Sequence, residues 1–123
     1  MKKATLLIPS GSSQHLFVIL TNPCDGNQCC VASFSSVKDG GKHDTTCLVA
    51  AGEHPSISKD SFIEYRMADV LPCDRITQFV TKWYYTPKPD VSEKLFERIR
   101  AGIEASDFTP RRVQMYFAAN HHR

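Results

Sequence analysis

The stretch His43–Leu71, HDTTCLVAAGEHPSISKDSFIEYRMADVL, contains two of the five histidines of the chain and two short runs that are typical of β-strands. The first run, residues 47–51, is apolar and ends at a glycine. The second run, residues 61–71, has the two-residue period of a half-buried strand. Its apolar residues Ile63, Tyr65 and Met67 alternate with Glu64 and Arg66.

The turn between these two runs places a histidine in a restricted backbone. His54 precedes Pro55, and a residue before proline is pushed toward an extended conformation. A histidine fixed in this way can transfer protons to and from a ligand. It can equally cap the turn or bond a neighbouring carbonyl group, so a catalytic and a structural interpretation of His54 both stay open.

Working outward from this stretch, the chain up to Leu71 predicts five short strands. Turn signals rich in Gly, Pro, Asn and Asp separate them, and the glycine loop KDGGK, residues 38–42, leads into His43. Short strands separated by turns are typical of a small barrel or sandwich. The expected strands are residues 5–8, 15–21, 28–37, 47–51 and 61–71.

From Pro72 onward the apolar spacing changes to that of helices. We expect a helix over 73–83, an extended link through YYTPKPD, a second helix capped by Ser92, and a third helix that Thr109 caps and Pro110 opens. The expected fold is mainly β with C-terminal helices. It is one domain, with a barrel of about five strands in residues 1–71 and a helical extension in residues 72–123.

The composition is that of a soluble globular domain. The 123 residues are 41% hydrophobic and 23% charged. No run reaches the roughly 20 apolar residues that a membrane helix needs. The apolar patch Leu6–Ile8 is too short for the core of a signal peptide. These features predict a cytoplasmic protein that does not contact a membrane.

The five cysteines are odd in number and form no Cys-x-x-Cys pair, which fits neither a disulfide framework nor a zinc ribbon. We expect them to be reduced and mostly buried. A nucleophilic thiol at Cys47, close in sequence to His43, is the alternative. The well-separated histidines have no metal-ligand spacing, so neither a metal nor a cofactor is expected.

The charge is distributed unevenly along the chain. Residues 1–71 carry six Lys/Arg against seven Asp/Glu, whereas residues 72–123 carry nine against six. Any basic surface is therefore local, with candidates in the pairs Lys38/Lys42 and Arg111/Arg112. For each pair, a solvated charged face is the alternative.

Four segments of the first 71 residues read HLFVILT, CCVASFSS, TCLVAAG and SFIEYRMADVL. Together these segments resemble the MazF/PemK family of toxins. The resemblance implies an SH3-like barrel and, in many members, a homodimeric endoribonuclease that cuts single-stranded RNA and is held in check by an antitoxin. Catalysis in that family depends on an arginine and a threonine. This chain has His15-Leu16 in place of the family's Arg-Pro, and Ser35 and Ser36 in place of the threonine.

These replacements leave residues that suit RNA cleavage. Histidine can act as the acid and the base that the 2′-hydroxyl and the leaving oxygen require, and a cation can stabilise the charged phosphorane. We therefore expect metal-independent cleavage if the strands bring the histidines to one rim. The candidate catalytic residues are His15, Ser35, His43, His54 and Arg66, and the candidate RNA-binding residues are Lys38, Lys42 and Tyr65.

The second hypothesis is a non-catalytic, SH3-like interaction module. The aromatic run Trp83, Tyr84 and Tyr85 beside the proline link would then anchor a protein partner. Packing of these rings between a helix and the barrel explains the same run equally well.

Overall fold

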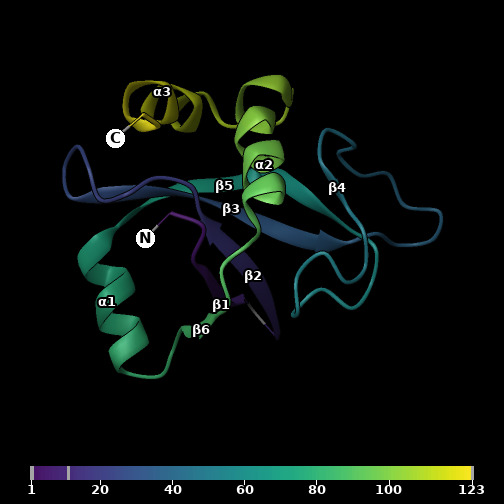
Figure 1. The fold of residues 1–123 in the computed structure, drawn as a ribbon, viewed down its shortest axis with the longest axis horizontal. Coiled ribbons are helices and arrows are strands. Elements are labelled where there is room, and N and C mark those ends of the chain that lie inside the picture. The colour runs from purple at the N-terminus through teal and green to yellow at the C-terminus, as the bar shows by residue number, and fades with distance from the viewer. Residues whose placement is uncertain (1, 11, 123) are drawn as a thin grey trace.

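A computed structural model describes residues 2–10 and 12–122 of the chain. Its sheet has six antiparallel strands in the order β4-β5-β3-β2-β1-β6 and curls into a half-barrel (Figure 1). The expected mainly β fold with C-terminal helices is confirmed, but the strands number six, not five. They are β1 Thr5–Ser10, β2 Ser13–Ile19, β3 Gln28–Ser36, β4 Leu48–Val49, β5 Ser61–Pro72 and β6 Thr86–Lys88.

The sixth strand comes from the segment expected to be an extended link. In β6, Pro87 lies opposite Leu6 of β1. Proline has no N–H to donate, so it is tolerated in a sheet mainly on edge strands, and β6 is an edge. At the other edge, the two-residue strand β4 has its Leu48 carbonyl bonded by the Arg98 side chain. The C-terminal part of the chain thus completes the sheet.

Strand β5 is the longest strand and has an irregularity that changes which residues it buries. The register with β3 shifts between the pair Val31–Asp69 and the pair Ser33–Glu64, so β5 has extra residues between these points. Ile63 and Tyr65, on the apolar face of the strand, are buried, but Met67 is 47% exposed. The predicted burial of Met67 is therefore wrong, because the strict two-residue alternation ends at the bulge.

Three helices follow: α1 Cys73–Thr81, α2 Glu93–Ala105 and α3 Arg111–Asn120. Ser92 caps α2 as predicted, since its hydroxyl accepts a hydrogen bond from the Leu95 N–H at 3.1 Å. The expected cap at Thr109 is wrong. Pro110 is the residue that precedes α3, and the Thr109 hydroxyl has no hydrogen-bond partner among the described residues.

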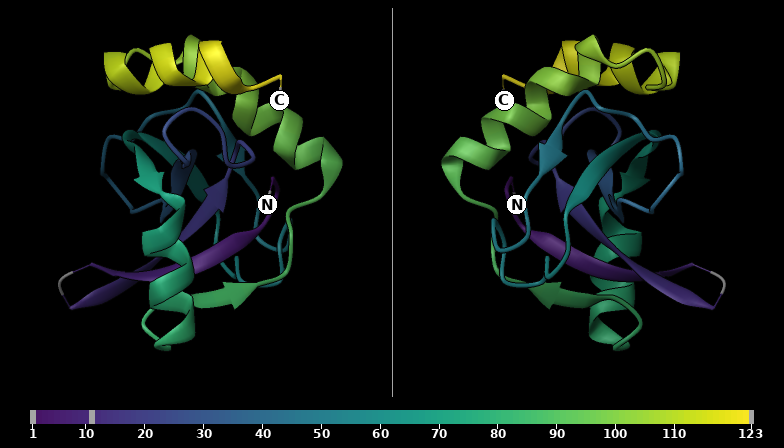
Figure 2. Two further views of the ribbon diagram at one scale, coloured as in Figure 1. Left: turned by 90° about the vertical axis from the view of Figure 1, so that its left-hand side faces the viewer. Right: turned by 90° about the vertical axis from the view of Figure 1, so that its right-hand side faces the viewer.

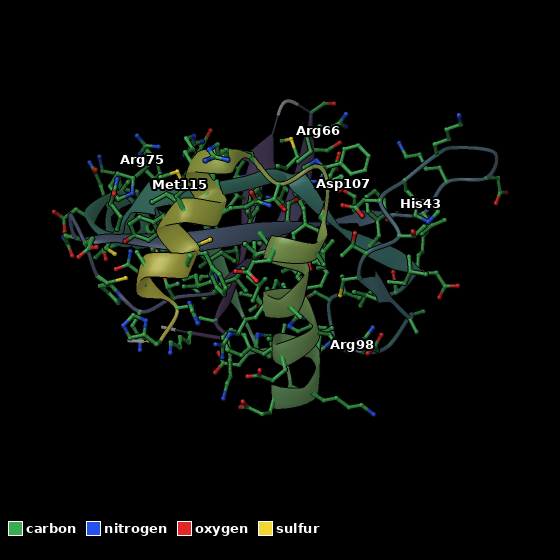
Figure 3. The ribbon with its side chains drawn as sticks, turned by 90° about the horizontal axis from the view of Figure 1, so that it is seen from above. His43, Arg66, Arg75, Arg98, Asp107 and Met115 are labelled. Atoms are coloured by element: carbon green, nitrogen blue, oxygen red, sulfur yellow. The ribbon has the colours of Figure 1, made fainter. Side chains whose placement is uncertain are left out.

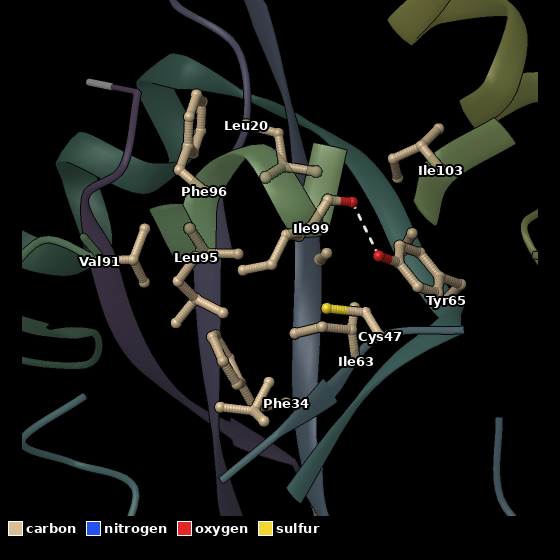
Figure 4. Close-up of a cluster of buried hydrophobic side chains, with 14 of the residues drawn as sticks. Leu20, Phe34, Cys47, Ile63, Tyr65, Val91, Leu95, Phe96, Ile99 and Ile103 are labelled. Carbon is tan, nitrogen blue, oxygen red and sulfur yellow. Dashed lines mark hydrogen bonds between the residues drawn. The ribbon is translucent and has the colours of Figure 1, made fainter. Parts of the chain in front are cut away.

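The helices cover both faces of the sheet, with α2 and α3 on one face and α1 on the other (Figure 2). The α2 side holds the larger core, built on a stripe of buried residues in that helix (Figure 4). The Tyr65 hydroxyl donates to the Ile99 carbonyl at 2.7 Å, and a side chain at Gly102 would collide with the same ring. This close contact locks β5 against α2. The stripe consists of Leu95, Phe96, Ile99 and Ile103.

Within the described residues, the longest helix, α2, has 13 residues, and no helix is both long and apolar enough to span a bilayer. No disulfide joins the five cysteines, of which Cys29, Cys30, Cys47 and Cys73 are buried.

Candidate functional site

A cleft of about 240 Å³ opens where β5, the loop before β4 and the turn between α2 and α3 meet. We call it the first cleft. Seen from above the helices, His43 and Arg66 lie on the side of the turn that carries Asp107, and Arg75 lies at the opposite end of the molecule (Figure 3). The first cleft combines charged, imidazole and aromatic side chains. They are Lys42, His43, Asp44, Phe62, Glu64, Arg66 and Phe108.

A carboxylate held at both oxygens lies in this cleft. Glu64 and Arg66 are two residues apart on β5, so the pleat of the strand turns them to the same face. The Arg66 guanidinium donates to Glu64 Oε1 at 3.0 Å, and the Ser35 hydroxyl on β3 donates to Oε2 at 2.6 Å. The Glu64 side chain is 21% exposed and that of Arg66 is 72% exposed. The carboxylate is fixed, while most of the Arg66 side chain remains accessible to a ligand.

His43 faces the same space. Its ring packs against Phe62 with 5.1 Å between the ring centroids. Its Nδ1 atom is buried and has no hydrogen-bond partner in the described part of the chain. Buried polar atoms nearly always have a partner, so this unpaired ring nitrogen is unusual.

Asp44 connects the His43 loop to the turn after α2. Its carboxylate accepts hydrogen bonds from the Ser106 hydroxyl at 2.6 Å and from the Thr46 N–H at 2.9 Å. Burial opposes the charged form, but these hydrogen bonds outweigh it and lower the pKa of Asp44. Ser106 Oγ in turn accepts from the Phe108 N–H at 3.1 Å. The Phe108 ring, 57% exposed, is therefore held at the rim of the cleft.

A second cavity of about 510 Å³ adjoins the first cleft and shares Phe62 and Glu64 with it. His15, Ser35 and Lys38 line this second cavity. Glu64 thus lies on the wall that the first cleft, with His43, shares with the second cavity, with His15. The wall is rich in hydroxyl groups, which come from Ser13, Ser35, Ser36, Ser56 and Ser61.

His54 lines neither space, and the structure favours its structural interpretation. The ring is 2% exposed, and its Nε2 lies 2.6 Å from the Pro89 carbonyl. Its Nδ1 accepts a hydrogen bond from the Ser56 N–H at 3.0 Å. Nε2 must therefore carry the ring proton and donate a hydrogen bond to the Pro89 carbonyl oxygen. Both ring nitrogens are engaged by the main chain, so the structure does not bring His54 together with His15 and His43.

Two other expectations are contradicted by burial. Tyr65, expected to contact RNA, is fully buried, and burial raises the pKa of its hydroxyl. A ring without exposed surface cannot stack on a base. Burial also raises the pKa of the Cys47 thiol, although nearby Arg98 opposes the shift. The nucleophilic interpretation of Cys47, which needs a lowered pKa, is therefore wrong.

The structure adds residues that the sequence interpretation missed. Glu64 had a usable signal, because it shares the polar face of its strand with Arg66. No sequence pattern pointed to Asp44 or Phe108. They line the same cleft only because the turn after α2 packs against the loop before β4. Among the described residues, no three His, Cys, Asp or Glu side chains form a group that could hold a metal ion.

The chain matches no family model, and it shows no significant similarity to the curated proteins and the solved structures with which it was compared. Its function therefore has to be argued from the first cleft and the second cavity.

Proposed function

We propose that this protein is an endoribonuclease that cleaves single-stranded RNA with its own side chains and without a metal ion. The observation that carries the proposal is Glu64, which is held by Ser35 and Arg66 on the wall shared by the two cavities, with His43 lining the same cleft. This arrangement supplies a proton acceptor, a cation and an imidazole in one accessible place. Those are the groups that cleavage next to a 2′-hydroxyl requires.

In the proposed reaction Glu64 removes the proton of the 2′-hydroxyl, and the 2′-oxygen attacks the adjacent phosphorus. The bond from phosphorus to the 5′-oxygen breaks, and protonated His43 gives its proton to that leaving oxygen. Arg66 donates hydrogen bonds to the phosphorane as its negative charge builds up. The products are a 2′,3′-cyclic phosphate and a free 5′-hydroxyl, so no water is consumed in this step.

The remaining predicted residues fall into supporting roles. Ser35, a candidate catalytic residue in the sequence, orients the Glu64 carboxylate. His15 and Lys38 line the second cavity, where they can bind the neighbouring nucleotide, and Lys42 does so in the first cleft. An RNA chain lying across both cavities would have to be unpaired, because bases can enter such pockets only when they are splayed out.

The resemblance of residues 1–71 to the MazF/PemK family supports a biological setting for this activity. We propose an SH3-like toxin that acts in the cytoplasm as a homodimer and is neutralised by an antitoxin. The curled antiparallel half-barrel supports the SH3-like part of this proposal, and the resemblance supports the rest.

The test is cleavage of single-stranded RNA by purified variants. Glu64→Gln and His43→Gln should each lower kcat/KM by about 10²- to 10⁴-fold, because each removes one proton-transfer group. The matched controls Glu104→Gln and His122→Gln change exposed residues outside both cavities and should retain wild-type activity. Products should end in a 2′,3′-cyclic phosphate, and EDTA should not change the rate. An inactive wild-type protein, or cleavage that survives both cleft substitutions, would refute the proposal.

A second candidate function is the non-catalytic interaction module, and one observation favours it. Trp83 is 91% exposed and has a φ of +64°, a conformation that is unfavourable for a bulky residue. Neither packing nor backbone geometry explains a tryptophan there. If a stoichiometric protein partner is lost with Trp83→Ala and retained with Glu64→Gln and His43→Gln, this candidate replaces the first.

A further inference from the structure

The turn after α2 and the beginning of α3 form a basic and aromatic rim beside the first cleft. Phe108 lines the cleft and is 57% exposed, and the exposed residues Arg111 and Arg112 follow within four positions. An aromatic ring near exposed arginines is the combination on which single-stranded nucleic acids bind, with bases stacked on the ring and phosphates paired with the cations.

The position of Phe108 relative to His43 is fixed, because Asp44 accepts a hydrogen bond from Ser106, whose hydroxyl accepts one from the Phe108 N–H. The main chain at Phe108 is therefore anchored beside the loop that carries the proposed acid, and the side chain lines the cleft. A ring on a fixed main chain loses little backbone freedom when a base stacks on it. This placement suits the nucleotide next to the scissile phosphate.

Arg112, at the start of α3, contacts β5 beyond the cleft residue Arg66. Arg112 pairs with Asp69 at 2.6 Å, and Asp69 lies three residues after Arg66 on β5. The two side chains of this ion pair are 64% and 42% exposed, so the pair contributes little stability and a phosphate can replace the carboxylate. Asp107 is an exposed acidic residue on the same turn. Arg66 is paired with Glu64 and Arg112 with Asp69, whereas no ion pair engages Arg111 among the described residues, so Arg111 is the cation most open to a phosphate.

We infer that single-stranded RNA leaves the first cleft over this rim, with one base stacked on Phe108 and the following phosphates bound by Arg111 and Arg112. The inference rests on the proposed function for the direction of the chain, but it concerns binding and not cleavage. A protein segment is the other class of ligand that an aromatic rim can take. The open Arg111 guanidinium and the exposed Arg112 pair favour RNA, because both can bind phosphates beside the exposed ring.

The test is the affinity for a labelled single-stranded RNA with 2′-O-methyl groups, measured by fluorescence anisotropy. This RNA has no free 2′-hydroxyl and cannot react by the proposed mechanism. Phe108→Ala and Phe108→Leu should both weaken binding about tenfold, because each removes the stacking face. Phe108→Tyr should retain wild-type affinity. Arg111→Ala and Arg112→Ala should each reduce the slope of log K against log salt by about 0.7.

Arg75→Ala and Lys82→Ala are the charge-matched controls, because they remove exposed basic residues of the α1 region. They should leave both affinity and salt slope near the wild-type values. Equal effects from the control and rim variants, or RNA affinity unchanged in Phe108→Ala, would overturn the inference. Cleavage of unmodified RNA is measured in parallel. A wild-type protein that binds through the rim but does not cleave would refute the proposed function and leave this inference standing.

Discussion

His54 and His43 are eleven residues apart in the chain, yet they lie in opposite kinds of environment. His54 is 2% exposed, and main-chain groups hold both of its ring nitrogens. His43 lines a cleft, and its Nδ1 has no hydrogen-bond partner among the described residues. The comparison shows that a restrictive backbone, which made His54 prominent in the sequence, indicates a structural role here. The proposed chemistry instead uses His43, which lines the cleft that also contains the fixed Glu64 carboxylate.

The largest effect on stability should come from removing the side chain of His54, the buried histidine. His54→Ala leaves a cavity and deprives the Pro89 carbonyl and the Ser56 N–H of a buried partner, so we expect a loss of about 2 to 4 kcal/mol in the free energy of unfolding. Urea denaturation measures this loss, with His122→Ala as the exposed control. If His54→Ala is as stable as the wild type but inactive on RNA, His54 belongs to the site and the comparison fails.

An intermediate effect is expected at Asp44, which links the His43 loop to the turn after α2. Asp44→Asn should cost about 1 kcal/mol at pH 7, because it weakens the hydrogen bonds from Ser106 and Thr46. The pKa of Asp44 is lowered in the folded state, so its stabilising contribution is present above the unfolded pKa and is lost as the pH falls through the folded value.

The stability difference between the wild type and Asp44→Asn should therefore shrink between pH 7 and pH 3, as followed by urea denaturation at each pH. Asp107→Asn, a change at an exposed carboxylate near the same cleft, serves as the control and should follow the wild type at both pH values. A constant difference across this range would show that the charge of Asp44 does not hold the two loops together.

The smallest effect on stability should come from His43, the histidine that lines the first cleft. His43→Leu removes a buried nitrogen that has no partner and keeps an apolar contact with Phe62, so stability should stay within about 0.5 kcal/mol of the wild type or rise slightly. Cleavage should be lost in the same variant. A destabilisation above about 2 kcal/mol, measured by urea denaturation, would place His43 with the structural histidines.

The fold could be predicted where the signals were local. The Ser92 cap, the buried stripe of α2 and the strand periods needed only the neighbouring residues. The strand Thr86–Lys88 could not be predicted, because two prolines argue against a strand unless its place at the sheet edge is known. The exposure of Met67 depends on a register shift between β3 and β5, which is a property of the pairing and not of either strand alone.

The candidate site was only partly visible in the sequence for a similar reason. The two cavities bring His15, Ser35, Lys38, Lys42, His43 and Arg66 around Glu64, but they leave out His54 and Tyr65. Residue type alone identified groups that can do chemistry. It could not separate those whose hydrogen bonds are already satisfied by the fold, because that separation depends on contacts between distant segments such as His54 and Pro89.

The sheet ends in very short strands on both sides, two residues in β4 and three in β6. Arg98 already occupies the Leu48 carbonyl on one edge, and Pro87 offers no N–H on the other. The two outermost strands themselves therefore offer few main-chain groups to an extended chain. Growth of the sheet from one copy to the next through β4 or β6 is thereby discouraged.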